Sequence, residues 1–271
     1  MKTKHPALIG LLLLGAILLP AGVGAVSRLT PQRYPGPTVP ISKITWGKAY
    51  QKDGLTVTPG AVAASFGRFN FYCQVSVTGR SSLVTLIPQG GGELPPRTEK
   101  VFLRVNADRS VTLLQQWYPL ANSGQPVQLK AIVTVDSGQL FAVLPKPYFS
   151  VNDGAKIKIS TIRWGKVQIK GRDCYLPGRI RTRSGRLTVF WKGGPGRIPQ
   201  LIWAGNSGVA GETDREEPLY LLKDAANNNT TTLYRERQPP PGRPGTADLG
   251  PVAAVKTGRL LGKLDQLHRK G

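Results

Sequence analysis

The segment ISKITWGK at residues 41–48 recurs as ISTIRWGK at residues 159–166, and this recurrence determines the architecture expected for the chain. The match extends well beyond it: residues 41–107 align with residues 159–225 at one constant offset and without a gap. Self-similarity at a long period is typical of duplicated structural units. The sequence therefore predicts two related modules in tandem.

Alternating side chains predict that each module is built from β-strands. Between residues 68 and 77, apolar and polar residues alternate, which is the pattern of a half-buried strand. The matching segment 186–192 keeps the same parity, and Pro-Gly turns recur at Pro59-Gly60 and Pro177-Gly178. The chain also has 32 Gly and 23 Pro, which favour many turns over long helices. The predicted fold class is all-β, with two tandem β-sandwich or barrel-like modules from an internal duplication and a short basic C-terminal helix.

The amino-terminal segment resembles an export signal. Lys2 and Lys4 precede an apolar run, and the small residues Val23-Gly24-Ala25 follow it. We expect cleavage after Ala25; the alternative is an uncleaved membrane anchor. The expected organisation is a signal peptide at 1–25, a Pro-rich leader at 26–40, a first β repeat at 41–125, a bridging β-hairpin at 126–155, a second β repeat at 156–237, and a Pro/Gly linker with a basic amphipathic tail at 238–271.

Local sequence patterns predict the bridging hairpin and the helix of the C-terminal tail. Residues 127–135 alternate before Asp136-Ser137-Gly138, and residues 139–144 then return, which predicts the bridging hairpin without an equivalent after the second copy. Within residues 252–269, four leucines recur at helical spacing between basic residues. The favoured interpretation is a short helix that packs on its own domain or frays; the alternative is a helix that lies on an anionic membrane or docks on a partner.

Positive charge is unevenly distributed between the copies. The chain carries 37 Lys and Arg against 15 Asp and Glu, a net charge of +22. Residues 155–200 contain twelve basic residues against Asp173 alone, whereas the matching residues 37–82 contain five against Asp53. The second copy therefore has the stronger attraction for anions.

The clearest basic pattern is an arginine at every second residue, which places Arg179, Arg181 and Arg183 on one face of a strand. We expect this face to bind a polyanion such as lipopolysaccharide, an acidic glycan, an anionic lipid or nucleic acid, the last being less favoured. The alternative is a solvated strand that resists aggregation. The predicted binding residues are Lys166, Lys170, Arg179, Arg181, Arg183 and Arg186.

Tryptophan and cysteine give two further expectations. Trp46 and Trp164 share a strand face with an isoleucine in each copy, so they are expected to plug the module cores rather than to stack on a ligand. Cys73 and Cys174 do not occupy matching positions. They either form a disulfide that joins the copies or remain small buried apolar side chains.

The inventory of reactive residues argues against catalysis. The two histidines are His5, in the predicted signal, and His268, in the tail, so a Ser-His-Asp or Cys-His site and a His-based metal centre are not expected. The acidic loop at 211–217 lacks the ligand spacing of a calcium site. We predict no catalytic residues, no metal and no cofactor.

The expected function follows from the predicted export signal and from the positive charge of the chain. The leading prediction is an exported, non-enzymatic structural or interaction protein of the envelope or cell surface, whether periplasmic, surface-bound or secreted. Its expected partners are envelope proteins or anionic envelope polymers and lipids. The alternative is a polyanion- or glycan-binding protein that uses the basic face of the second repeat.

Overall fold

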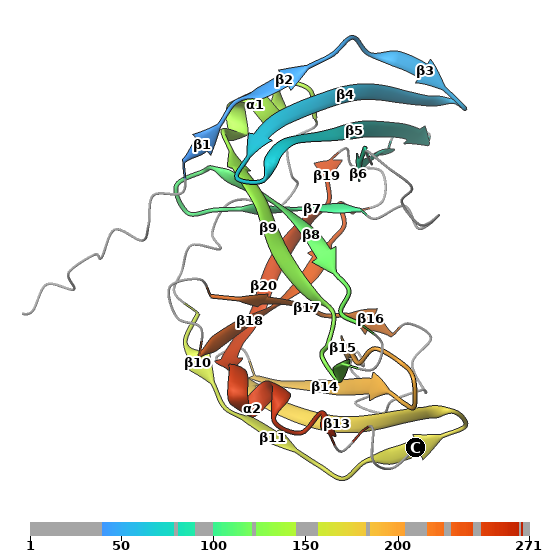
Figure 1. The fold of residues 1–271 in the computed structure, drawn as a ribbon, viewed down its shortest axis with the longest axis vertical. Helices are drawn as coiled ribbons and strands as arrows, with labels where there is room; N and C mark the ends of the chain where they lie inside the picture. Colours follow the sequence, from blue (N-terminus) through green and yellow to red (C-terminus); the bar gives the residue numbers. More distant parts are fainter. Residues whose placement is uncertain are drawn as a thin grey trace, which may run out of the picture. The chain divides into compact units, whose positions relative to one another are not determined.

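The computed structural model describes residues 40–78, 81–89, 100–120, 123–144, 157–182, 185–203, 216–224, 229–240, 245–265 and 267 (Figure 1). The predicted signal peptide and almost all of the leader lie outside these residues. The described part consists mostly of β-strands with two five-residue helices, so the predicted all-β class is confirmed. Residues 37–271 form one compact unit.

In the first half, the strands form one sheet in the order β1-β9-β8-β7-β6-β5-β4-β2. Strand β1 pairs in parallel with β9, and β2, which follows β1 after Lys43, pairs antiparallel with β4. The short segment 41–46 therefore supplies the strands at both ends of this order, β1 and β2. The strands are β1 (Ile41–Ser42), β2 (Ile44–Trp46), β3 (Tyr50–Lys52), β4 (Leu55–Ala64), β5 (Gly67–Thr78), β6 (Ser81–Pro88), β7 (Val101–Val105), β8 (Val111–Trp117) and β9 (Gln128–Val135).

In the second half, the strands form a sheet in the order β10-β20-β18-β17 and another in the order β11-β13-β14-β15-β16. Strand β10 pairs in parallel with β20, and β11 pairs antiparallel with β13. The strands are β10 (Ile159–Ser160), β11 (Ile162–Trp164), β12 (Gln168–Lys170), β13 (Asp173–Thr182), β14 (Gly185–Gly193), β15 (Gln200–Trp203), β16 (Glu217–Pro218), β17 (Tyr220–Lys223), β18 (Thr230–Arg237) and β20 (Asp248–Lys256).

The two halves share an order of paired elements. Strands β1 to β4 and β10 to β13 have corresponding bounds at the offset of the sequence repeat. Each half ends in a strand followed by a helix: α1 (Ser137–Phe141) follows β9, and α2 (Thr257–Leu261) follows β20. The pairing irregularities also correspond, at Leu113/Leu114 and at Leu233/Tyr234. Descent of the halves from one ancestral copy stays a prediction.

The bridging hairpin predicted at 126–155 is wrong. Strand β9 is part of the first sheet, and the segment expected to return as a strand instead starts with helix α1. The Asp136 carboxylate caps this helix by accepting a 3.0 Å hydrogen bond from the Gln139 backbone N–H. Leu140 and Leu144, one helical turn apart, are both buried. The second half does have an equivalent, which is β20 followed by α2.

The predicted tail helix is much shorter than expected. Residues 252–256 belong to β20, and helix α2 covers only Thr257–Leu261. Leu260, Leu264 and Leu267 are 0%, 4% and 0% exposed and pack in the core of the second half. The structure therefore shows the short helix packed on its own domain. In the linker, β19 (Gly245–Thr246) pairs in parallel with β6 of the first half.

Each half has its own hydrophobic core, and a tryptophan packs against each as predicted. The Trp46 indole N–H donates to the Gln139 carbonyl at 3.1 Å, and the Trp164 indole N–H donates to the Arg259 carbonyl at 2.8 Å. Each ring lies over a glycine of the strand that pairs with its own, β4 or β13. A Cβ added at Gly178 would lie 2.4 Å from the Trp164 ring. The repeated tryptophans thus tie the first strands of each half to its helix.

Candidate functional site

Four arginines gather on the outward side of the second half's larger sheet. Strand β13 alternates, so that Ile180 is buried while Arg179 and Arg181 are exposed. The strand register places Arg163 of β11 opposite Arg179, and Arg186 of β14 opposite Arg181. Arg163 and Arg186 are also exposed. We call Arg163, Arg179, Arg181 and Arg186 the arginine face.

The arginine face carries uncompensated positive charge. Side chains directly opposite each other on paired strands have Cβ atoms about 4.5–5.5 Å apart, and like charges there are destabilising. Within the part of the chain that the structure describes, none of the four makes an ion pair with a carboxylate. The described carboxylates therefore leave the charge of these four arginines open to solvent or to an external anion.

The structure brings together three of the six residues predicted from the sequence: Arg179, Arg181 and Arg186. Lys166 is exposed in the turn between β11 and β12, and Lys170 is exposed at the end of β12, opposite Asp173 rather than beside the arginines. Arg183 lies outside the described residues. Sequence reasoning did not place Arg163 in the site, although its position between the inward residues Ile162 and Trp164 indicates an outward side chain.

The first half has the same strand geometry without the charge. Its equivalent positions are Thr45, Ala61, Ala63 and Arg68, and the register again pairs Thr45 with Ala61 and Ala63 with Arg68. Only Arg68 is basic. The backbone therefore does not require arginine at the other three positions.

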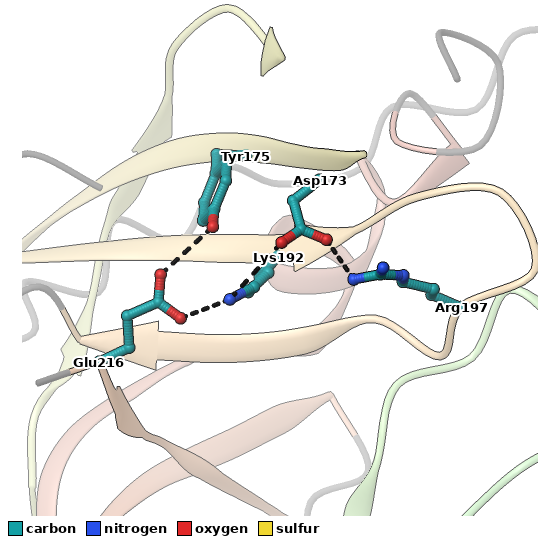
Figure 2. Close-up of polar contacts among 5 residues, drawn as sticks. All are labelled: Asp173, Tyr175, Lys192, Arg197 and Glu216. Atoms are coloured by element: carbon teal, nitrogen blue, oxygen red, sulfur yellow. Dashed lines mark hydrogen bonds and ion pairs between the residues drawn. The ribbon is translucent and has the colours of Figure 1, made fainter. Parts of the chain in front are cut away.

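Farther along the same side of the sheet, a second group of polar residues is balanced in charge (Figure 2). The Lys192 Nζ lies 2.6 Å from Glu216 Oε2 and 3.7 Å from Asp173 Oδ2. The other Asp173 oxygen accepts from Arg197, and the Tyr175 hydroxyl donates to Glu216 Oε1 at 3.3 Å. Because two cations face two carboxylates, this network adds no net charge to the sheet.

Two members of the network, Tyr175 and Lys192, have raised pKa values and keep their protons at neutral pH. Burial raises the pKa of Tyr175, and the negative charge of Glu216 raises it further. Burial lowers the pKa of Lys192, but its hydrogen bonds with Glu216 and Tyr175 outweigh this effect and leave that pKa raised. Tyr175 is thus neutral and Lys192 charged at neutral pH, so neither side chain is poised as a general base.

Apolar side chains separate the network from the arginine face. Tyr175, Phe190 and Ile202 form a small cluster on the outward side of the sheet, and each is at most 5% exposed. The outward row of β13 accordingly runs from Asp173 through Tyr175 and Pro177 to Arg179 and Arg181. On this row, the positive charges without a carboxylate partner, those of Arg179 and Arg181, lie at the carboxyl end of β13, close to the start of β14.

Of the two alternatives for the cysteines, the structure shows buried free thiols and no disulfide between the copies. Cys73 and Cys174 are free and buried, and they belong to different core clusters. Burial raises the pKa of the Cys73 thiol to about 12. Each cysteine instead fills space in its own core.

We predict that neither thiol reacts with iodoacetamide in the folded protein, because both side chains are buried and inaccessible to the reagent. Mass spectrometry should show no alkylation under native conditions and two additions in urea without any reductant. If reduction were needed before alkylation in urea, the two cysteines would be bonded.

The described residues contain neither a metal-ligating cluster nor a membrane-spanning helix. No group of three or more His, Cys, Asp and Glu side chains there could hold a metal ion. Within the same ranges, no helix has the length and apolar character to cross a membrane.

No protein-family model matches the chain, and neither a curated protein nor a solved structure is significantly similar to it.

Proposed function

We propose that the protein is an exported, non-enzymatic binding protein that holds a polyanion of the cell envelope on the arginine face. Two pairs of opposed arginines carry this proposal: Arg163 with Arg179 and Arg181 with Arg186, without a carboxylate partner among the described residues. Folding gains nothing from opposing like charges. A bound polyanion would turn this repulsion into attraction.

The geometry suits a ligand with closely repeated negative groups. Cross-strand neighbours are about 5 Å apart at Cβ, and neighbours along a strand are about 7 Å apart. Guanidinium groups bind phosphate, sulfate and carboxylate through paired hydrogen bonds. The four arginines therefore match the adjacent charges of an acidic glycan, a lipopolysaccharide core or an anionic lipid surface.

Nucleic acid is the less favoured polyanion. Proteins that hold single strands usually add exposed aromatic rings on which bases stack. The aromatic residues nearest the arginine face along β13 and β14, Tyr175 and Phe190, are 5% and 2% exposed. The envelope setting rests on the predicted signal peptide at residues 1–25.

Retention on immobilised heparin tests this function. A variant R163T/R179A/R181A gives the second half the residues found at the equivalent positions of the first half. The variant should fold, because the same strand register accommodates those residues in the first half. With three fewer positive charges on the arginine face, it should elute at markedly lower salt than the parent protein. Reciprocal T45R/A63R substitutions at the exposed equivalents in the first half should raise the eluting salt.

A matched control removes the same charge elsewhere. Lys43, Lys48 and Lys52 are exposed in the first half, so K43S/K48S/K52S lowers the net charge equally while leaving the arginine face intact. This control should elute close to the parent protein. Equal losses in the two triple variants would show that retention reflects net charge alone. Unchanged retention of the arginine variant would instead favour a purely structural or protein-contact role.

A further inference from the structure

A cleft of about 200 Å³ lies at the junction of the two halves and apart from the arginine face. The first half contributes residues 104–107, and the second half contributes Tyr234 and Pro251. Arg104 is its cationic side chain. Sequence reasoning gave this residue no role.

Among the residues that the structure describes, the Arg104 guanidinium is held by neutral groups only. Its Nε donates to Asn106 Oδ1 at 3.1 Å, and its Nη2 donates to Thr112 Oγ1 at 3.4 Å. Asn106 is itself positioned by hydrogen bonds from its amide to Ser110 and Thr112, both 2.9 Å long. Among the described residues, Arg104 makes no ion pair, and its Nη1 has no hydrogen-bond acceptor.

The nearby carboxylate of Asp108 is engaged elsewhere. It accepts hydrogen bonds from the Ser110 hydroxyl at 2.6 Å and from the Ser110 backbone N–H at 2.9 Å. These two bonds lower the pKa of Asp108. Asp108 therefore stabilises the turn between β7 and β8, and no carboxylate within the described ranges compensates the positive charge of Arg104.

The equivalent place in the second half shows that the fold does not need this arginine. The halves meet through an apolar cluster built from equivalent positions, in which the rings of Phe102 and Tyr220 lie 4.6 Å apart. The strand pairs Arg104 with Thr112 in the first half and Leu222 with Thr232 in the second. Leu222 thus stands where Arg104 stands, and it packs against the shared cluster.

We propose that the Arg104 cleft binds a small organic carboxylate. One carboxylate neutralises one guanidinium and accepts hydrogen bonds from its Nη1 and Nη2 groups. The walls at Tyr234 and Pro251 offer ring surface to a short apolar body. The cleft is smaller than the roughly 300–1,000 Å³ typical of sites for drug-sized ligands, so the ligand has few heavy atoms.

Calorimetric titration of the full chain tests this site, with isobutyrate and benzoate as probes. Acetate, which lacks the larger apolar body, measures the apolar contribution to binding, and phosphate at matched ionic strength serves as an inorganic anion for comparison. Isobutyrate or benzoate should bind saturably with one site, and more tightly than acetate or phosphate. R104L, which installs the residue of the second half, should weaken binding about tenfold or more, because it removes a charge-assisted contact. Circular dichroism establishes that the variant is folded.

R104K provides a second variant, because lysine keeps the charge but loses the planar fork and the bond to Asn106. It should bind more weakly than the parent protein and more tightly than R104L. The triple variant R163T/R179A/R181A should bind as the parent does, which separates this site from the polyanion proposal. Equal binding by R104L and the parent, no saturable binding of any carboxylate, or binding of phosphate alone would each overturn the inference.

Discussion

Replacing Asp248 with asparagine should lower the free energy of unfolding by about 3 kcal/mol, near the lower end of the cost of breaking a buried ion pair. Asp248 is 2% exposed, and its two carboxylate oxygens face Arg237, with Nε to Oδ1 at 2.9 Å and Nη2 to Oδ2 at 2.6 Å. The amide of asparagine removes the negative charge that these two hydrogen bonds bring to Arg237 in a largely buried position. Chemical denaturation measures the change.

The first half supplies a matched control for this ion pair. The register that pairs Arg237 with Asp248 pairs Trp117 with Gln128. A double variant R237W/D248Q therefore installs a neutral pair that the same strand geometry already accommodates, and it should recover most of the stability that D248N loses. A loss below about 1 kcal/mol in D248N would mean that the pair is effectively solvated.

Truncating the two helix leucines together should have a larger effect. Leu140 of α1 and Leu260 of α2 are both 0% exposed, and each packs in the core of its own half. Leu-to-Ala changes at buried positions cost about 2–5 kcal/mol each. Because the two core clusters share no residues, the losses in L140A/L260A should add to within about 0.5 kcal/mol.

Urea denaturation of both single variants and of the double variant measures this additivity. L120A serves as the control, because Leu120 is 85% exposed and its truncation should leave stability nearly unchanged. A double variant that is much less or much more destabilised than the sum would show that the halves share one core. Strong coupling of that kind would contradict the two-core account.

Local alternation predicted the strands correctly, because side-chain parity depends only on near neighbours. Phe71 and Cys73 face the first core, and Val189 and Trp191 face the second, as the alternating pattern indicated. The repeated tryptophans were also correctly expected to pack in the modules. These features are properties of a few consecutive residues and of the pleat of a strand.

The turns expected at Pro59-Gly60 and Pro177-Gly178 are wrong, because both pairs lie within strands, β4 and β13. The other errors came from short apolar runs. Residues 139–144 suit either a strand or one helical turn, and the Asp136 cap together with burial of Leu140 and Leu144 decides for the helix. The helical spacing of the tail leucines correctly indicated one shared face. Periodicity could not tell that this face packs in the second core, because what covers a face depends on tertiary structure.

Long-range pairing decided which charges meet. Arg179 and Arg181 share a strand, so the sequence places them together, whereas Arg163 joins them only through the register of β11 with β13. The same limit applies to the cysteines, whose assignment to separate cores determines that they are not bonded. The Arg104 cleft likewise combines residues that lie more than a hundred positions apart.

The most direct test of the arginine face is the salt dependence of its affinity for a defined heparin fragment. The slope of log K against log salt is negative, and each contact with a phosphate or sulfate that is lost reduces its magnitude by roughly one. The slope for R163T/R179A/R181A should therefore be smaller than that of the parent by about two to three, while K43S/K48S/K52S should keep the parental slope. Identical slopes for the parent and the arginine variant, or equal reductions in both triple variants, would contradict the assignment of polyanion binding to this face.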